Sequence, residues 1–255
     1  MTILAIDIGN TRTRLARVND RKVETPVVLP TGEVPRIDEA IKNLFRQSDE
    51  KTPLTIVVCS VVPHLTDHVA ELARMSLDTE ARIIGRNLPL PMKLHLKDTQ
   101  RVGSDRVAAA AMAFERIGKA VAVASFGTAI TIDCVNDDGA FLGGAILPGL
   151  QLSAKALEEH TAQLTLVDLI PPETPWGRDT AEAISAGIVF GAAGALREII
   201  ERYATELGRW PELIVTGGDG PLMAKYCDFI KAVVPELVLM GIELAYDHAR
   251  ENTEK

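Results

Sequence analysis

The chain has 255 residues, 47% of them hydrophobic and 24% charged, a composition typical of a globular protein and unlike that of a disordered chain. Its formal net charge of −8 argues against a protein that follows a nucleic-acid backbone, and it favours small-molecule partners. No uninterrupted apolar run approaches the roughly 20 residues that span a bilayer. We therefore expect no nucleic-acid partner, no membrane partner and a cytoplasmic location.

The first half of the chain alternates predicted strands and helices. Apolar runs at 3–7, 11–18 and 23–29 predict an antiparallel meander with a turn at Gly9 and Asn10. Apolar residues at helical spacing predict helices over 37–45 and after Pro63, and the β-branched run 54–58 predicts a central strand. Short strands are expected at 82–85 and 92–96. The alanine-rich stretch 105–117 predicts a helix that ends at Gly118.

The second half repeats the opening arrangement. A strand at 120–124, a turn at Gly127 and strands at 129–135 and 140–146 correspond to the N-terminal meander. Gly127 stands 118 residues after Gly9 (127 − 9), close to half of the chain. We infer an internal duplication and two lobes, 1–117 and 118–255.

A long helix is predicted over 179–207, followed by a strand at 213–216 and a three-glycine turn at 217–220. The helix carries Ala183, Gly187, Gly191 and Gly194, so one side has little bulk and can admit another helix closely. We predict that this face forms a symmetric dimer contact. The turn at 217–220 would suit the base or ribose of a nucleotide.

Two turns join a strand to a glycine and then a hydroxyl residue: Asp7-Ile8-Gly9-Asn10-Thr11, here the first glycine turn, and Ser125-Phe126-Gly127-Thr128, the second glycine turn. Glycine tolerates positive φ and lets backbone N–H groups approach an anion, so two facing turns of this kind suit a phosphate chain. Asp7 could then hold a metal ion. The alternative is that each is an ordinary hairpin turn.

Between the lobes, Gly103-Ser104-Asp105-Arg106 stands where a loop enters the alanine-rich helix. In a phosphotransferase a carboxylate often takes the proton of the acceptor hydroxyl, and Asp105 is the candidate base. Arg106 could hold a substrate carboxylate through two parallel hydrogen bonds. The alternatives are a helix cap for Asp105 and a salt bridge within the protein for Arg106.

The three cysteines Cys59, Cys134 and Cys227 are far apart in the sequence and lie in or beside apolar stretches. This distribution predicts buried thiols rather than disulfides or a metal cage. The sequence assigns them no chemistry.

The order of these motifs resembles that of the type III pantothenate kinases. The resemblance rests on the two glycine turns, Gly103-Ser104-Asp105-Arg106 and Thr216-Gly217-Gly218, supported by the segments 59–63, 143–150 and 177–180, so it covers nearly the whole chain. It implies an α/β, duplicated actin-like and Hsp70-like (RNase H-like) ATPase fold with two lobes, each a mixed sheet flanked by helices. It also implies a homodimer that phosphorylates the terminal hydroxyl of pantothenate with ATP, the first step of coenzyme A biosynthesis.

The resemblance also implies roles for individual residues. The opening turn would bind ATP and Mg²⁺ through Asp7, Ile8, Gly9, Asn10, Thr11, Arg12, Thr13 and Arg14, and the second turn would contact ATP through Thr128. Asp105 would be the base, with Gly103, Ser104 and Arg106 beside pantothenate, and Thr180 would reach substrate across the dimer interface.

Two positions depart from the family pattern. Ser125 stands where the family usually has an aspartate that helps to bind K⁺ or NH₄⁺, and a neutral hydroxyl is a weaker cation ligand. Leu96 falls about where the family has a tyrosine near the pantothenate pocket. These departures motivate one alternative, a catalytically impaired regulator that binds nucleotide or pantothenate. A kinase for another small hydroxyl compound is a further alternative, because this fold serves many substrates.

Overall fold

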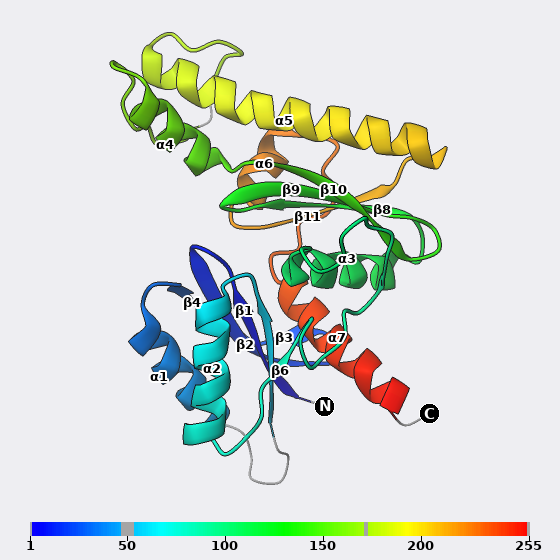
Figure 1. The fold of residues 1–255 in the computed structure, drawn as a ribbon. Helices are drawn as coiled ribbons and strands as arrows, with labels where there is room; N and C mark the ends of the chain where they lie inside the picture. The colour runs from blue at the N-terminus through cyan, green and yellow to red at the C-terminus, as the bar shows by residue number, and fades with distance from the viewer. Residues whose placement is uncertain (1, 47–53, 171–172, 254–255) are drawn as a thin grey trace. The chain divides into compact units, whose positions relative to one another are not determined.

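The structure is a computed structural model that describes residues 2–46, 54–170 and 173–253 (Figure 1). The chain forms two compact units: the first comprises Met1–Arg116 with Glu236–Lys255, and the second Ile117–Pro235. The boundary expected at 117/118 lies within one residue of the observed one. The sequence predicted that the C-terminal residues belong to the second lobe, but in the structure Glu236–Lys255 belong to the first unit. The reason is helix α7 (Leu237–Thr253), whose buried Leu239 and Ile242 share a hydrophobic cluster with Ile3 and Ala5.

The first unit contains a mixed sheet in the order β3-β2-β1-β5-β6, with β4 also paired to β2. Strand β1 is antiparallel to β2 and parallel to β5. The strand expected at 23–29 is two short strands in the structure. The strands of this sheet are β1 (Ile3–Ile8), β2 (Arg12–Asn19), β3 (Lys22–Val23), β4 (Val27–Pro30), β5 (Thr55–Ser60) and β6 (Arg82–Ile83).

Helices cover both faces of this sheet because the strands are apolar on both sides. Leu4, Ile6 and Ile8 belong to the cluster with α1 (Val34–Arg46) and α2 (Pro63–Ser76), whereas Ile3 and Ala5 face α7. Figure 1 shows α1 and α2 on one side of the sheet and α7 on the other. Strand β7 (Lys93–Leu94) and helix α3 (Ser104–Ile117) follow β6 in the chain.

Helix α3 packs closely on α7. At Gly241 an added Cβ would lie 2.1 Å from the carbonyl oxygen of Ala108, so only glycine permits the crossing. The alanines of α3 are buried almost completely. The small residues that gave this segment its helix propensity therefore also allow backbones to approach.

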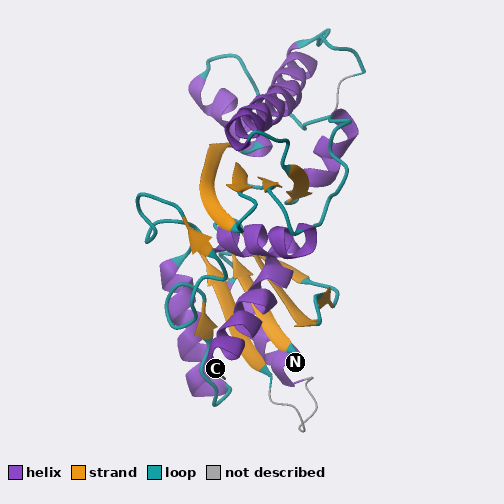
Figure 2. Cartoon of the chain, turned by 90° about the vertical axis from the view of Figure 1, so that its right-hand side faces the viewer, coloured by secondary structure: helices purple, strands orange, loops and turns teal. Residues whose placement is uncertain are grey.

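The second unit contains a sheet with the order β11-β8-β9-β10. Helices α4 and α5 pack against each other, and α6 contacts α5. Figure 2 shows helices in purple and strands in orange. The strands are β8 (Val121–Phe126), β9 (Ala129–Val135), β10 (Ala140–Pro148) and β11 (Glu212–Thr216). The helices are α4 (Leu150–His160), α5 (Thr180–Leu207) and α6 (Gly220–Tyr226).

The two units repeat one strand arrangement. In the first unit β1 is antiparallel to β2 and parallel to β5, and in the second β8 is antiparallel to β9 and parallel to β11. The third strand of each repeat, β4 or β10, pairs with the second. The internal duplication expected from the sequence is therefore present in the topology.

Helix α5 is long and apolar enough to cross a membrane by length and composition alone. Core helices of soluble proteins meet the same criterion. Only 33% of the most apolar 18-residue stretch of α5 is buried within the single chain. An added Cβ at Gly187, Gly191 or Gly194 would meet no atom within 4 Å, so this face of the helix has no neighbour in the described residues.

Candidate active site

The first glycine turn closes the β1–β2 hairpin. The amide of Gly9 donates to the carbonyl of Arg12 at 3.0 Å. Neither Gly9 nor Gly127 has a positive φ, so tolerance of positive φ does not explain glycine at these two positions. The structural reason is space, since an added Cβ at Gly9 would lie 3.1 Å from the Arg12 carbonyl oxygen. Asn10, Thr11 and Arg12 are exposed.

Thr31, which the sequence reasoning missed, holds this turn from behind. Its hydroxyl donates to the carbonyl of Gly9 at 2.7 Å and its amide donates to the carbonyl of Thr11 at 3.0 Å. The buried hydroxyl of Thr13 lies 3.1 Å from that of Thr31. Two carbonyls of the turn are thus occupied on the protein side. The side chain of Thr13 is enclosed, and so is that of Ile8, so these two members of the predicted ATP-binding segment support the turn from within.

Asp7 stands at the end of β1, paired across the hairpin with Arg14. The pKa of its carboxyl is raised to about 7, mainly by burial and also by the nearby Asp105 carboxylate, while Arg14 opposes both effects. The carboxylates of Asp7 and Asp105 therefore lie close enough to influence each other. The structure brings together the proposed metal ligand and the proposed base, which are nearly a hundred positions apart in the sequence.

Asp105 lies in the first turn of α3. Its carboxylate accepts hydrogen bonds from the backbone of Arg106 and from its own amide, which lower its pKa, but burial outweighs them and the pKa is raised. The Oδ1 atom is buried and has no hydrogen-bond partner among the described residues. The helix-cap interpretation therefore explains the hydrogen bonds of the carboxylate with backbone amides. It does not explain Oδ1, which is left to accept a hydrogen bond from a ligand. A buried acceptor without a partner is costly, and such atoms gather at functional sites.

Gly103 is required for this placement of Asp105. A Cβ added at Gly103 would lie 2.5 Å from Oδ1 of Asp105 and 3.5 Å from a methyl of Val61. Glycine at this position therefore lets the carboxylate fold back over the loop.

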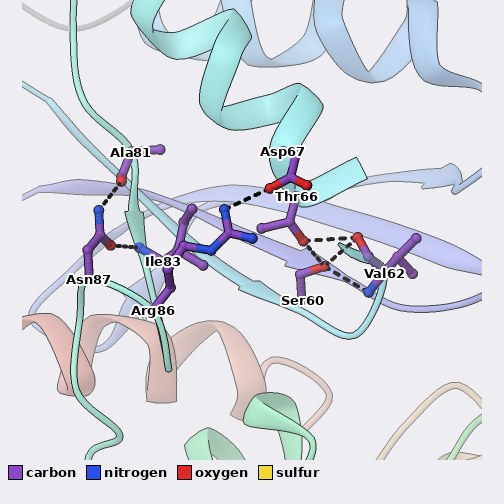
Figure 3. Close-up of polar contacts among 8 residues, drawn as sticks. All are labelled: Ser60, Val62, Thr66, Asp67, Ala81, Ile83, Arg86 and Asn87. Atoms are coloured by element: carbon purple, nitrogen blue, oxygen red, sulfur yellow. Dashed lines mark hydrogen bonds and ion pairs between the residues drawn. The ribbon is translucent and has the colours of Figure 1, made fainter. Parts of the chain in front are cut away.

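The loop beside Gly103 is held by a small network at the start of α2. Ser60 Oγ accepts from the amide of Val62 at 3.0 Å and from the hydroxyl of Thr66 at 2.7 Å, as Figure 3 shows. The amide of Val61 donates to the carbonyl of Ile8, which joins this loop to the first glycine turn. In the same view Arg86 forms an ion pair with Asp67. The side chain of Asn87 accepts from the amide of Ile83 and donates to the carbonyl of Ala81.

Cys59 is the member of this region whose chemistry the sequence did not indicate. All three cysteines are free and buried, as predicted. Cys59, however, pairs with Asp7 in the sheet, and its Sγ donates to Oγ of Ser104 at 3.2 Å. Register across the sheet was the missing information, because residues 7 and 59 are distant in sequence.

The second glycine turn lies in the second unit, where three segments meet at the ends of their strands. An added Cβ at Gly149 would lie 2.2 Å from the carbonyl oxygen of Gly127, and one at Gly217 would lie 2.3 Å from that of Phe126. The amide of Asp219 donates to the Phe126 carbonyl at 3.1 Å. The predicted nucleotide-side turn at 217–220 is thus adjacent to the second glycine turn. Gly217 has a φ of +91°, a conformation that favours glycine.

The remaining predicted positions are on the surface or partly buried. Thr128 is exposed, and Ser125 is partly buried between Thr131 and Thr216 of the neighbouring strands. Thr180 is exposed at the start of α5, next to Asp179, whose carboxylate caps the helix through the Glu182 amide at 2.8 Å. Leu96 is partly buried, so it is not a core residue.

The oxygens at this site fit Mg²⁺ held jointly with phosphate groups. Across the described residues, no three His, Cys, Asp or Glu side chains converge as a metal cage. Mg²⁺ bound to nucleotides usually takes only one or two carboxylates, together with phosphate oxygens and water. Asp7 fits this description, because a cation beside it would offset its burial and the repulsion from Asp105.

Comparisons with known proteins agree with this geometry. The family model for type III pantothenate kinases matches residues 3–202. A protein named type III pantothenate kinase from Desulfatibacillum aliphaticivorans is 33% identical over 252 residues, which cover 96% of this chain and 98% of the relative. The chain belongs to the type III pantothenate kinase family.

Solved structures show the same fold at lower identity. A putative Baf family transcriptional activator from Campylobacter jejuni has a TM-score of 0.64 and 21% identity, over 99% of this chain and 100% of that one. Component A of (R)-2-hydroxyglutaryl-CoA dehydratase from Acidaminococcus fermentans has a TM-score of 0.58 and 12% identity, over 100% of both chains. The duplicated actin-like ATPase fold expected for a type III pantothenate kinase is confirmed.

Proposed function

We propose that the protein phosphorylates pantothenate to 4'-phosphopantothenate with ATP, the first step of coenzyme A biosynthesis, and that Asp105 is the general base. Membership of the type III pantothenate kinase family supports the reaction and its substrates. The observation that carries the role of Asp105 is its buried Oδ1, an acceptor without a partner in the described residues, beside Asp7.

The site residues of the first unit each have a role in this reaction. The exposed residues 10–12 of the turn bind phosphate oxygens through their backbone, while Thr31 keeps the carbonyls of Gly9 and Thr11 on the protein side. Asp7 holds Mg²⁺, which when bound neutralises charge on the phosphates. Asp105 accepts the proton of the pantothenate hydroxyl through Oδ1. Arg106, at the same helix start, binds the substrate carboxylate.

The second unit also carries residues with proposed nucleotide contacts. Thr128 contacts ATP, and the turn at 217–220 lies against the adenosine. A monovalent cation, K⁺ or NH₄⁺, would be bound weakly, because Ser125 offers a neutral oxygen.

The working form is a cytoplasmic homodimer joined through α5. The open glycine face of that helix supports this, as do its exposed Phe190 and the exposed apolar residues Leu166 and Ile170 of the preceding segment. In the dimer, Thr180 of each chain contributes to the substrate site of the other. A fully active monomer, detected by light scattering at micromolar concentration, would contradict this assembly.

The function is tested by incubating the purified protein with ATP, Mg²⁺ and pantothenate, with and without K⁺ or NH₄⁺, and measuring phosphopantothenate. Asp105→Asn keeps the shape of the side chain and removes the base, so we expect both ligands to bind while turnover is lost. Product formation by Asp105→Asn at the wild-type rate would remove Asp105 from the mechanism. Binding of both ligands by the wild type without turnover would instead indicate a regulator, the alternative suggested by Ser125 and Leu96. Turnover of sugars or short hydroxy acids, with none of pantothenate, would indicate a kinase for another substrate.

A further inference from the structure

Cys59 occupies a position between the two carboxylates of the site. The parallel pairing of β1 with β5 sets Cys59 beside Asp7, and the thiol is buried completely. On its other side, Sγ donates to Oγ of Ser104 at 3.2 Å. Ser104 directly precedes Asp105. One thiol therefore touches the residue that begins α3 and neighbours the proposed metal ligand on β1.

The contact continues from Ser104 back to the sheet. Ser104 Oγ donates to the carbonyl of Ser60 at 3.4 Å, and the hydroxyl itself is nearly enclosed. The thiol of Cys59 and the carbonyl of Ser60 thus hold one hydroxyl from both sides. The backbone of residues 59 and 60 is fixed by its ladder with β1. The first turn of α3 is in this way tied to the strand that carries Asp7.

The thiol also suits this place because it is neutral. The thiol holds its proton in the hydrogen bond that Sγ donates to Oγ of Ser104. An ionised group here would add to the repulsion between the two acids. A small neutral donor fixes Ser104 without adding charge.

We propose that Cys59 is a positioning residue for phosphoryl transfer: through Ser104 it holds the start of α3 so that Oδ1 of Asp105 stays aimed at the acceptor hydroxyl. This role rests on the proposed function of Asp105. A bond of this kind is worth a modest amount, so its loss lowers the rate about fivefold rather than abolishing it.

Two substitutions at residue 59 separate positioning from packing. Cys59→Ala removes the donor, and we expect kcat to fall about fivefold with the KM for ATP unchanged. Cys59→Ser restores a donor of similar size and should restore kcat to within about twofold. Cys227→Ala is the matched control, because Cys227 is also free and buried but lies in the core of the second unit. It should lower the melting temperature about as much as Cys59→Ala does and leave kcat unchanged.

A double-mutant cycle with Ser104→Ala tests the path. If Cys59 acts through Ser104, the double variant loses no more kcat than Ser104→Ala alone. Equal loss of kcat in Cys59→Ala and Cys227→Ala, failure of Cys59→Ser to restore the rate, or additive losses in the cycle would each overturn the proposal.

A measurement without turnover separates this proposal from the proposed function. Hydrogen exchange of the amides of residues 104–108 should be several-fold faster in Cys59→Ala than in the wild type and normal in Cys59→Ser. If the wild type makes no phosphopantothenate but the exchange follows this pattern, the proposed reaction fails while the positioning role stands. Unchanged exchange in Cys59→Ala would refute the positioning role whatever the activity.

Discussion

Gly103→Ala should separate activity from stability. The added Cβ would lie 2.5 Å from Oδ1 of Asp105, about 1 Å short of the 3.4 Å at which ordinary contact begins. Gly103 does not have a positive φ, so alanine fits its backbone conformation. The strain falls on the end of one side chain, which can rotate away. The fold should therefore tolerate the substitution, with a change of at most about 1 kcal/mol in the free energy of unfolding.

The same rotation moves the proposed base. A displacement of about 1 Å at a reacting group can cost about a hundredfold in rate, so we expect kcat to fall by roughly that factor. The assay compares kcat for phosphopantothenate formation with the melting temperature of the same preparation. Gly32→Ala is the control, because its Cβ would meet no atom within 4 Å and it should change neither quantity.

Two results would refute this reasoning. A Gly103→Ala enzyme with kcat within threefold of the wild type would show that the position of Oδ1 does not control the rate. A fall of ten degrees or more in melting temperature would show that the clash is absorbed by the backbone and not by the Asp105 side chain.

Three further perturbations test separate parts of the site. Thr31→Val removes the hydroxyl that donates to the Gly9 carbonyl, so we expect the KM for ATP to rise about tenfold. Thr31→Ser keeps the hydroxyl and should have a KM near that of the wild type. An unchanged KM for ATP in Thr31→Val would contradict the role of Thr31 in holding the turn. Asp7 has a pKa raised to about 7, so its ionised form opposes folding above that pH and the penalty is relieved as pH falls toward 4. Asp7→Asn should therefore stabilise the ligand-free protein by up to about 4 kcal/mol at pH 8 and by less at pH 5, while abolishing activity. Thermal unfolding at both pH values checks this, and an equal or larger gain at pH 5 would contradict it. Ser125→Asp should strengthen the dependence of the rate on K⁺, measured as the ratio of rates with and without the ion. A variant with the same ratio as the wild type would exclude residue 125 from cation binding.

The sequence predicts the elements that carry local signals and misses those that do not. The hairpins are found because strands and turn residues alternate, and α3 and α5 because alanine-rich or long apolar stretches favour helices. Helices α4 and α7 were not predicted. The apolar residues that bury α7 are matched to strands β1 and β5 at the far end of the chain, and no local pattern shows that partner.

The site follows the same rule. Asp7, Gly103 and Asp105 were identified because they belong to recognisable motifs, and Asp7 and Asp105 are close enough in the structure to perturb each other's environment. Thr31 and Cys59 could not be found in that way. A threonine before a helix and a cysteine in an apolar strand are unremarkable in sequence, and each gains its role from a partner reached through the sheet or across a turn.

The duplication also explains why the proposed acid–base chemistry belongs to the first unit. Equivalent strand positions carry Asp7 in one repeat and Ser125 in the other. The neighbours of Asp7 on β2 and β5 are Arg14 and Cys59, whereas those of Ser125 on β9 and β11 are the hydroxyl residues Thr131 and Thr216. The first repeat thus has an acid at the end of its central strand, with a second acid supplied by α3, while the second repeat has only hydroxyls there. A metal site and a proton acceptor require acidic side chains. Binding of a nucleotide through backbone amides requires neither acids nor hydroxyls. The two repeats can therefore keep one strand arrangement while only the first acquires the charges that phosphoryl transfer needs.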